Sequence, residues 1–204
     1  MDISAQDRER ISTAIRAAEA KTSGEIVCVL AETSSAAATT VPVLLAALGA
    51  LALPWLLVTF TAMPVFRILT LQIVAFVVLI ALFCWTPVRV ALMPRRARRA
   101  VAHRVAMEQF RIRGLGKKPD RTGILIFVSL AERYARIIAD DGISGRVPQS
   151  QWQAAVDALI AHMRDGRIAD GFVAAIDLCG NELANHFPRT GTLRDNLPDR
   201  IHLI

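Results

Sequence analysis

Two long apolar segments, residues 41–63 and 68–88, interrupt an otherwise mixed pattern of hydrophobic and polar positions. From Thr33 to Val88 the only charged residue is Arg67, in the connection between the segments. A helix that rises about 1.5 Å per residue needs about 20 residues to cross a hydrocarbon core of roughly 30 Å, and each segment is that long. The pattern predicts a transmembrane helical hairpin; burial of both helices inside a soluble protein is the alternative.

The stretch before the hairpin predicts one helix and one strand. Apolar side chains recur at helical spacing at Ile11, Ile15 and Ala18, which indicates an amphipathic helix over about residues 5–21. The run EIVCVL at residues 25–30 is short and rich in β-branched side chains, as is typical of a buried strand.

The stretch after the hairpin predicts a basic helix, two strands and two further helices. The run ILIFVSL at residues 124–130 has the continuous apolar character of a central strand. A turn through residues 131–133 would make the next strand antiparallel to it. Apolar stripes at helical spacing then predict two helices, one around Trp152 and one around Phe172.

This order of elements predicts an α/β fold. We expect a three-layer domain with a small mixed central sheet flanked by helices, interrupted by the two-helix transmembrane hairpin. In the tail, Ile201 and Leu203 alternate with His202 and predict a short edge strand. The expected division is a first part of the domain, the hairpin, the remainder of the domain and a C-terminal tail, at residues 1–35, 41–88, 89–188 and 189–204.

The positive charge is concentrated in one part of the chain. The formal net charge is +6 at pH 7, and residues 89–118 alone hold ten Lys and Arg against one acid, Glu108. Because this run starts where an apolar segment ends, it predicts contact with a lipid bilayer that has anionic headgroups. No nucleic-acid partner is expected, since no binding motif and no interleaved aromatics accompany the arginines. The candidate membrane-surface residues are Arg89, Arg95, Arg96, Arg98, Arg99 and Arg104.

The distribution of arginines also predicts the orientation in the membrane. The connection between the apolar segments holds only Arg67, whereas five arginines follow the second segment. The first residues, MDISAQDRER, are charged and lack the apolar stretch of a signal peptide. We therefore expect a multi-pass protein of the bacterial inner membrane whose N- and C-terminal parts are cytoplasmic.

Three stretches of the sequence resemble the TPM-domain family. They are ISTAIRAAEAKTSGEIVCVL, DRTGILIFVSLAERYARIIADDGISGRVP and RIADGFVAAIDLCGNELANHFPR, which lie in this order outside the hairpin. The resemblance implies a central sheet flanked by helices, commonly tethered to a membrane. It also implies that the domain could bind calcium or act as an acid phosphatase, as proposed for some members.

The candidate metal ligands lie around the loop that follows the strand predicted after the turn at residues 131–133. Members of the family often carry a Gly-Tyr-Gly-Leu-Glu-Gly run here, where this chain has Asp140, Asp141 and then Gly-Ile-Ser-Gly, with Ser144 in place of the Glu. Asp140 and Asp141, with Glu132 and Asp120 if the loops converge, offer the hard oxygen atoms that a divalent cation such as calcium prefers. A solvated turn is the alternative interpretation of the adjacent acids.

No catalytic motif accompanies these acids. The sequence contains no HExxH, P-loop, GxSxG or CxxxxxR pattern, its four histidines are scattered, and its three cysteines are widely spaced. The favoured hypothesis is a membrane-anchored cytoplasmic module for interaction or regulation, acting with another membrane protein or as a homo-oligomer. The alternative is a phosphatase-like acid hydrolase that depends on calcium or magnesium.

Overall fold

The computed structural model describes residues 3–34, 40–60, 64–85, 88, 90–91, 93–117, 122–189 and 198–204. The chain divides into two compact units. The sheet unit consists of Met1–Thr33 and Ala102–Ile204, and the hairpin unit is Ser34–Val101. The hairpin unit is thus inserted into the sequence of the sheet unit soon after its first strand.

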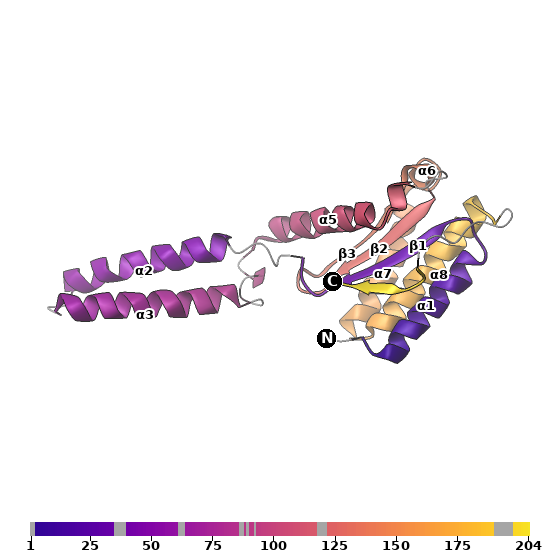
Figure 1. Cartoon of the computed structure of the whole chain (residues 1–204). Helices are drawn as coiled ribbons and strands as arrows, with labels where there is room; N and C mark the ends of the chain where they lie inside the picture. Colours follow the sequence, from indigo (N-terminus) through magenta and orange to yellow (C-terminus); the bar gives the residue numbers. More distant parts are fainter. Residues whose placement is uncertain are drawn as a thin grey trace. The chain divides into compact units, whose positions relative to one another are not determined.

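A four-stranded mixed sheet forms the centre of the sheet unit (Figure 1). Its strands lie in the order β3-β2-β1-β4, and β1 runs parallel to both β2 and β4. The strands β2 and β3 are antiparallel neighbours, which confirms the predicted hairpin, and β4 is the predicted edge strand. The strands are β1 (Glu25–Ala31), β2 (Gly123–Ser129), β3 (Tyr134–Ala139) and β4 (Ile201–Leu203).

Helices cover both faces of this sheet, as the continuous apolar runs of β1 and β2 require, since every residue of these two strands is buried. Side chains alternate along β1, so Ile26, Cys28 and Leu30 join the core under one helical layer. Val27 and Val29 instead pack with the opposite helical layer. The fold class is confirmed at this level, an α/β domain whose mixed sheet is flanked by helices.

The larger core lies between the sheet and three helices, α1 (Ala5–Glu19), α7 (Gln149–Arg164) and α8 (Ile168–His186). The smaller core lies under the second half of α5 (Arg95–Ile112), with Leu115 of the short 3₁₀ helix η1 (Leu115–Lys117). A single turn of helix, α6 (Asp141–Ser144), follows β3.

The hairpin unit contains two long helices, α2 (Thr40–Phe60) and α3 (Val65–Cys84), which pack along each other. Small residues line the contact: Ala46 and Ala50 are buried, and a Cβ atom on Gly49 would lie 3.1 Å from Leu79. The short side chains let the two helix backbones approach closely.

Of the two predicted membrane spans, the described residues offer one candidate. By length and composition, one helix could cross a bilayer, Val65–Phe83, with a mean hydropathy of 2.6. It begins earlier than the predicted residue 68, because Val65 and Phe66 already belong to the helix. The apolar part of α2, Val43–Thr59, is shorter than such a span, so the two-span hairpin is not established among the described residues.

Candidate functional site

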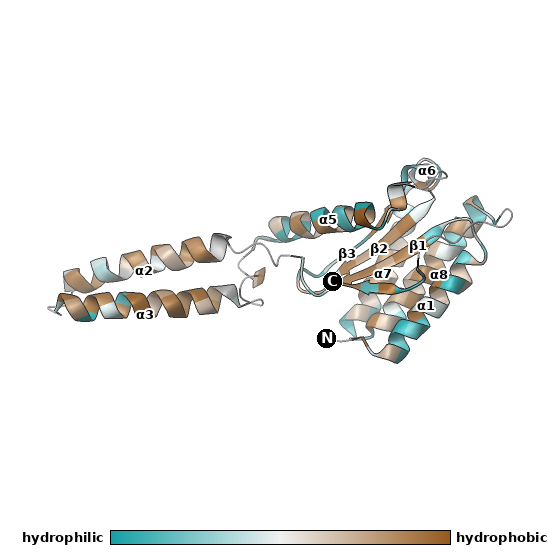
Figure 2. Ribbon diagram, in the orientation of Figure 1, coloured by the Kyte–Doolittle hydropathy of each residue, from teal (hydrophilic) through white to brown (hydrophobic). Residues whose placement is uncertain are grey.

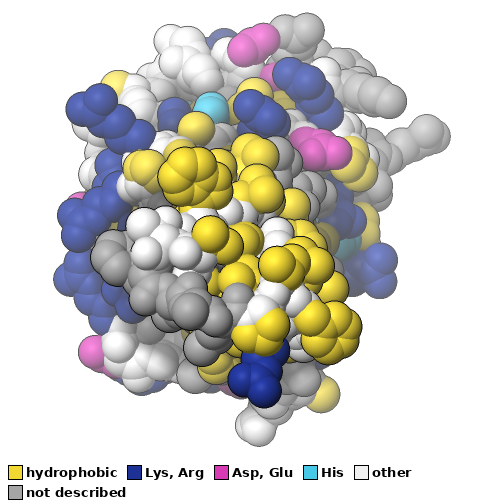
Figure 3. Space-filling view, turned by 90° about the vertical axis from the view of Figure 1, so that its left-hand side faces the viewer, with side chains coloured by type: hydrophobic (Ala, Val, Ile, Leu, Met, Phe, Trp, Pro, Cys, Tyr) yellow, Lys and Arg dark blue, Asp and Glu magenta, His cyan; other side chains and the backbone are white. Residues whose placement is uncertain are grey.

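The surface of the hairpin unit is unusually apolar for a protein in water. In the window Val65–Phe83 only 6% of the residues are buried. Large side chains are widely exposed on both helices, for example Trp55 at 82% and Phe66 at 80%. Figure 2 shows α2 and α3 as mostly hydrophobic, and Figure 3 shows hydrophobic side chains gathered over these helices. Soluble proteins rarely expose contiguous apolar patches beyond a few hundred Å².

The polar side chains of the two helices are compatible with an apolar surrounding. The Thr59 hydroxyl donates to the Trp55 carbonyl over 2.7 Å, and the Thr70 hydroxyl donates to the Phe66 carbonyl over 2.9 Å. Both hydroxyls are therefore satisfied within their own helix and need no water.

The predicted basic residues lie in the first half of α5 and, for Arg104, in its middle, except Arg89, which is outside the described residues. Arg95, Arg96, Arg99 and Arg104 are exposed, and Arg98 is half-buried. None of these five forms an ion pair with a described carboxylate. The first turn of α5 contains no acid. Cations at a helix N-terminus oppose the helix dipole, so these arginines are not explained by the stability of α5 itself.

Asp140 occupies the end of β3 and begins α6. Its N–H donates to the Gly123 carbonyl over 2.9 Å, and its Oδ1 accepts from the Asp141 N–H over 2.7 Å. The residue is only 5% exposed, and its Oδ2 is buried with no hydrogen-bond partner. Asp141 is exposed in the first turn of α6. Asp140 and Asp141 therefore lie side by side, and Oδ2 of Asp140 can still accept a hydrogen bond or bind a cation.

Glu132 does not join them. It lies in the turn between β2 and β3, where it accepts hydrogen bonds from the Ser129 hydroxyl and, over 3.1 Å, from the Thr33 hydroxyl. Asp140 lies at the other end of the same two strands. Five residue steps of about 3.4 Å separate the two ends of the hairpin, roughly 17 Å.

The set Asp140, Asp141 and Glu132 is thus not one site, and Asp120 is outside the described residues. Among the residues that the structure describes, no group of three or more His, Cys, Asp or Glu could hold a metal ion. The pair Asp140 and Asp141 remains the candidate.

The described cysteines and histidines do not form a nucleophilic centre. Cys28 and Cys179 are free and buried, and burial raises the pKa of both thiols. A thiol that stays protonated is a poor nucleophile. His162 is hydrogen-bonded to the Ala158 carbonyl of its own helix through Nδ1, over 2.9 Å.

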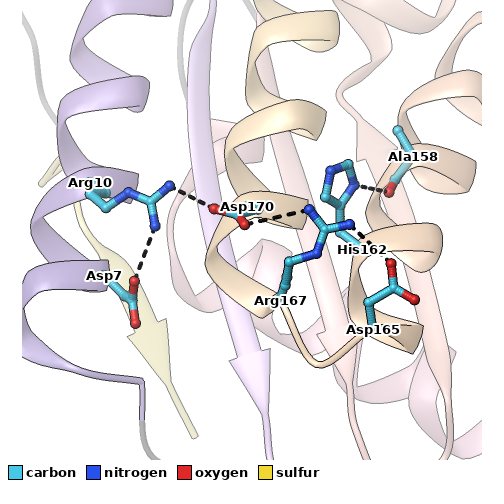
Figure 4. A network of polar contacts seen from close by, with 7 residues as sticks. All are labelled: Asp7, Arg10, Ala158, His162, Asp165, Arg167 and Asp170. Atoms are coloured by element: carbon cyan, nitrogen blue, oxygen red, sulfur yellow. Dashed lines mark hydrogen bonds and ion pairs between the residues drawn. The ribbon is translucent and has the colours of Figure 1, made fainter.

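A network of ion pairs joins α1 to the start of α8 (Figure 4). The Arg10 guanidinium lies 2.6 Å from the Asp170 carboxylate and 3.3 Å from that of Asp7. Arg167 lies 3.0 Å from Asp165 and 3.9 Å from Asp170. The network connects α1 and α8, which lie in the same helical layer. None of its ion pairs involves the buried acid Asp140. No local sequence pattern predicts the network, because Arg10 and Asp170 are 160 residues apart.

The variant Asp170→Asn is expected to weaken the pH dependence of stability on the acid side. The hydrogen bond from Arg10 lowers the pKa of the Asp170 carboxyl from its ordinary value. The stabilisation is therefore complete above the unfolded carboxyl pKa of about 3.9 and is lost as the pH falls through the lower folded value. Acid titration of unfolding should be less steep below about pH 4 in the variant than in the wild type.

The control for this titration is Asp177→Asn, an exposed acid of α8 with no ion pair among the described residues. Equal acid sensitivity in Asp170→Asn, Asp177→Asn and the wild type would contradict a role for the Arg10 pair.

Comparison with known proteins identifies the sheet unit. Residues 86–182 match the family model described as TPM domain. The chain is also similar in fold to the BA42 protein from the psychrophilic bacterium Bizionia argentinensis sp. nov., with a TM-score of 0.62 and 20% identity, over 100% of this chain and 96% of that one. No curated protein matches the chain. The match includes α5, β2, β3, α7 and most of α8, and this part of the chain is a TPM domain.

Proposed function

We propose that this protein is a membrane-anchored TPM-domain module that acts through interaction, with anionic lipid at its basic helix and with a membrane protein or a second copy of itself. The observation that carries the proposal is the exposure of α3, whose window of hydropathy 2.6 is only 6% buried. A helix of this kind needs an apolar surrounding, which a bilayer supplies.

The charges around the hairpin support an orientation. The hairpin unit offers Arg67 between its helices, whereas the arginines that follow α3 are numerous. Under the positive-inside rule, both flanks of the hairpin then lie in the cytoplasm, with α2 as the second span. This orientation also keeps both parts of the sheet unit on one side of the inner membrane.

The basic start of α5 would face the lipid headgroups. Each Arg near an anionic surface contributes on the order of 1 kcal/mol to membrane binding. The same phosphates would offset the repulsion between these arginines and the positive end of the helix dipole. The module would thus be held at the membrane surface by α5 as well as by its spans.

The test of the interaction role is chemical cross-linking of the full chain in its native membranes, followed by detergent extraction and mass measurement. The expected product contains this 22.3 kDa chain together with a membrane protein or a second copy. A chain that is resistant to alkaline carbonate extraction but never cross-links would retain the anchor and contradict the interaction role.

A metal-dependent phosphatase is the second candidate, and Asp140 is the observation that favours it. The buried, unpartnered Oδ2 is an acceptor that a cation would satisfy. Asp141 is next to it, so these residues fit part of a calcium site, which takes six to eight oxygen ligands. Water and carbonyl oxygens would have to supply the rest, because Glu132 is at the other end of β2 and β3.

The double variant Asp140→Asn, Asp141→Asn is expected to lose any stabilisation of the chain by calcium. A ligand at 100 times its Kd raises the free energy of unfolding by about 2.7 kcal/mol, which thermal unfolding with and without calcium would detect. Hydrolysis of a phosphate monoester at acid pH would be followed in parallel.

The matched control removes two other exposed acids, Asp165→Asn and Asp177→Asn. Stabilisation and hydrolysis that persist unchanged in the Asp140 and Asp141 double variant would exclude this pair from the second candidate function.

A further inference from the structure

A cluster of hydrogen-bond donors lies where the end of α5 meets the edge strand β4. The Arg113 guanidinium contacts Nδ1 of His202 through Nη1 over 2.9 Å and donates from Nη2 to the Gln109 side chain over 3.2 Å. His202 is 9% exposed and pairs with Val29 of β1 in the sheet. Both contacts fix the plane of the guanidinium.

The positive charge of this cluster has no acidic partner among the described residues. Neither Arg113 nor Arg200 forms an ion pair, and the adjacent Asp199 pairs with neither of them. Burial and, after it, the like charge of Arg200 lower the pKa of Arg113. A half-buried guanidinium without a counter-ion is unusual, because charged groups out of water are normally paired.

The side-chain groups of Arg113 and His202 that have no hydrogen-bond partner among the described residues are donors. Arg113 has five N–H donors, of which the described residues accept two, and its Nε is buried without a partner. Burial and the two arginines lower the pKa of His202 to about 4, so its ring is neutral near pH 7. Since Nδ1 accepts from Arg113, the ring proton is on Nε2 and adds another donor.

We propose that Arg113, Arg200 and His202 form a binding site for a phosphate-type oxyanion. Such an ion supplies several acceptor oxygens and the missing negative charge, and Arg binds it through paired N–H groups. The site lies in the sheet unit and depends neither on the membrane anchor nor on Asp140. Free phosphate and a lipid headgroup share this chemistry.

The test is calorimetric titration of the full chain, in a neutral detergent, with inorganic phosphate. The cleanest variant is Arg200→Gln, because the Arg200 side chain is exposed and makes no hydrogen bond among the described residues, so its loss should leave the fold intact. We expect Arg200→Gln to weaken phosphate binding about tenfold or more, as for one charged hydrogen bond. Arg136→Gln, an exposed arginine of β3, is the matched control and should bind like the wild type.

A second measurement distinguishes oxyanion binding from a purely structural role of the contact between Arg113 and His202. Bound phosphate favours the charged imidazole, so phosphate should raise the His202 pKa from about 4 in an NMR titration of the wild type but not of Arg200→Gln. Competition between phosphate and vesicles containing phosphatidylglycerol would indicate a headgroup as the source of the oxyanion, and binding without competition would indicate free phosphate. Equal affinity in Arg200→Gln and wild type, or no binding of either probe, would overturn the proposal.

Discussion

Replacing Trp152 with alanine is expected to lower the free energy of unfolding of the sheet unit by about 3–5 kcal/mol. Trp152 is 1% exposed and is among the largest fully buried side chains of the described residues. It belongs to the core between the sheet and α1, α7 and α8. Alanine would leave a cavity that the surrounding helices and strands can fill only in part.

Native-state hydrogen exchange of the β2 amides, with the full chain in detergent, is the measurement. These amides report on the sheet unit, whereas the signal of α2 and α3 in total helicity would obscure its unfolding. The control is Gln151→Ala, an exposed neighbour in the same helix, for which protection should be within about 0.5 kcal/mol of wild type. A loss below 1 kcal/mol in Trp152→Ala would contradict the described core.

Substitution of two valines in the middle of α3 by arginine is expected to abolish stable membrane insertion. Val74 and Val77 are 56% and 60% exposed on the surface that we assign to lipid. Each Arg near the centre of a span costs about 2.5–3.5 kcal/mol, so the double variant Val74→Arg, Val77→Arg loses about 5–7 kcal/mol.

Alkaline carbonate extraction of membranes measures this effect directly. The wild-type chain should remain with the bilayer, and the double variant should be released or degraded. The matched control, Gln151→Arg with Ala154→Arg, adds the same charge to exposed positions of α7 and should remain with the bilayer. Retention of the α3 variant to the wild-type extent would show that α3 is not in contact with hydrocarbon.

Local patterns in the sequence were sufficient for most elements of the sheet unit. The apolar runs of β1 and β2 and the turn before β3 have signals within a few residues, and the structure contains all three strands. Even the short β4 is predicted by its alternating apolar and polar residues. Its parallel pairing with β1 is a long-range contact that no local pattern specifies. Helix α1 was also predicted, and it ends at Glu19 rather than near residue 21.

The candidate site could be predicted only in part, because proximity in sequence does not fix proximity in space. Asp140 and Asp141 are neighbours in both senses, whereas Glu132 is eight residues away in sequence and at the opposite end of an extended hairpin. The Arg113 and His202 contact joins residues 89 apart, so no spacing rule would have found it. The sequence shows Arg113 only as one of the basic residues of the run 89–118. It does not show that Arg113 lacks an acidic partner among the described residues.

The proposed arrangement, a TPM domain held on the cytoplasmic side by a membrane hairpin, is tested most directly by thiol labelling of two cysteine variants in intact bacteria. Val65→Cys lies at the start of α3, beside the connection, and Gln151→Cys lies on the exposed surface of α7. A membrane-impermeant maleimide should label Val65→Cys in intact cells and Gln151→Cys only after permeabilisation. Labelling of Gln151→Cys in intact cells, or of Val65→Cys only after permeabilisation, would contradict the proposed arrangement.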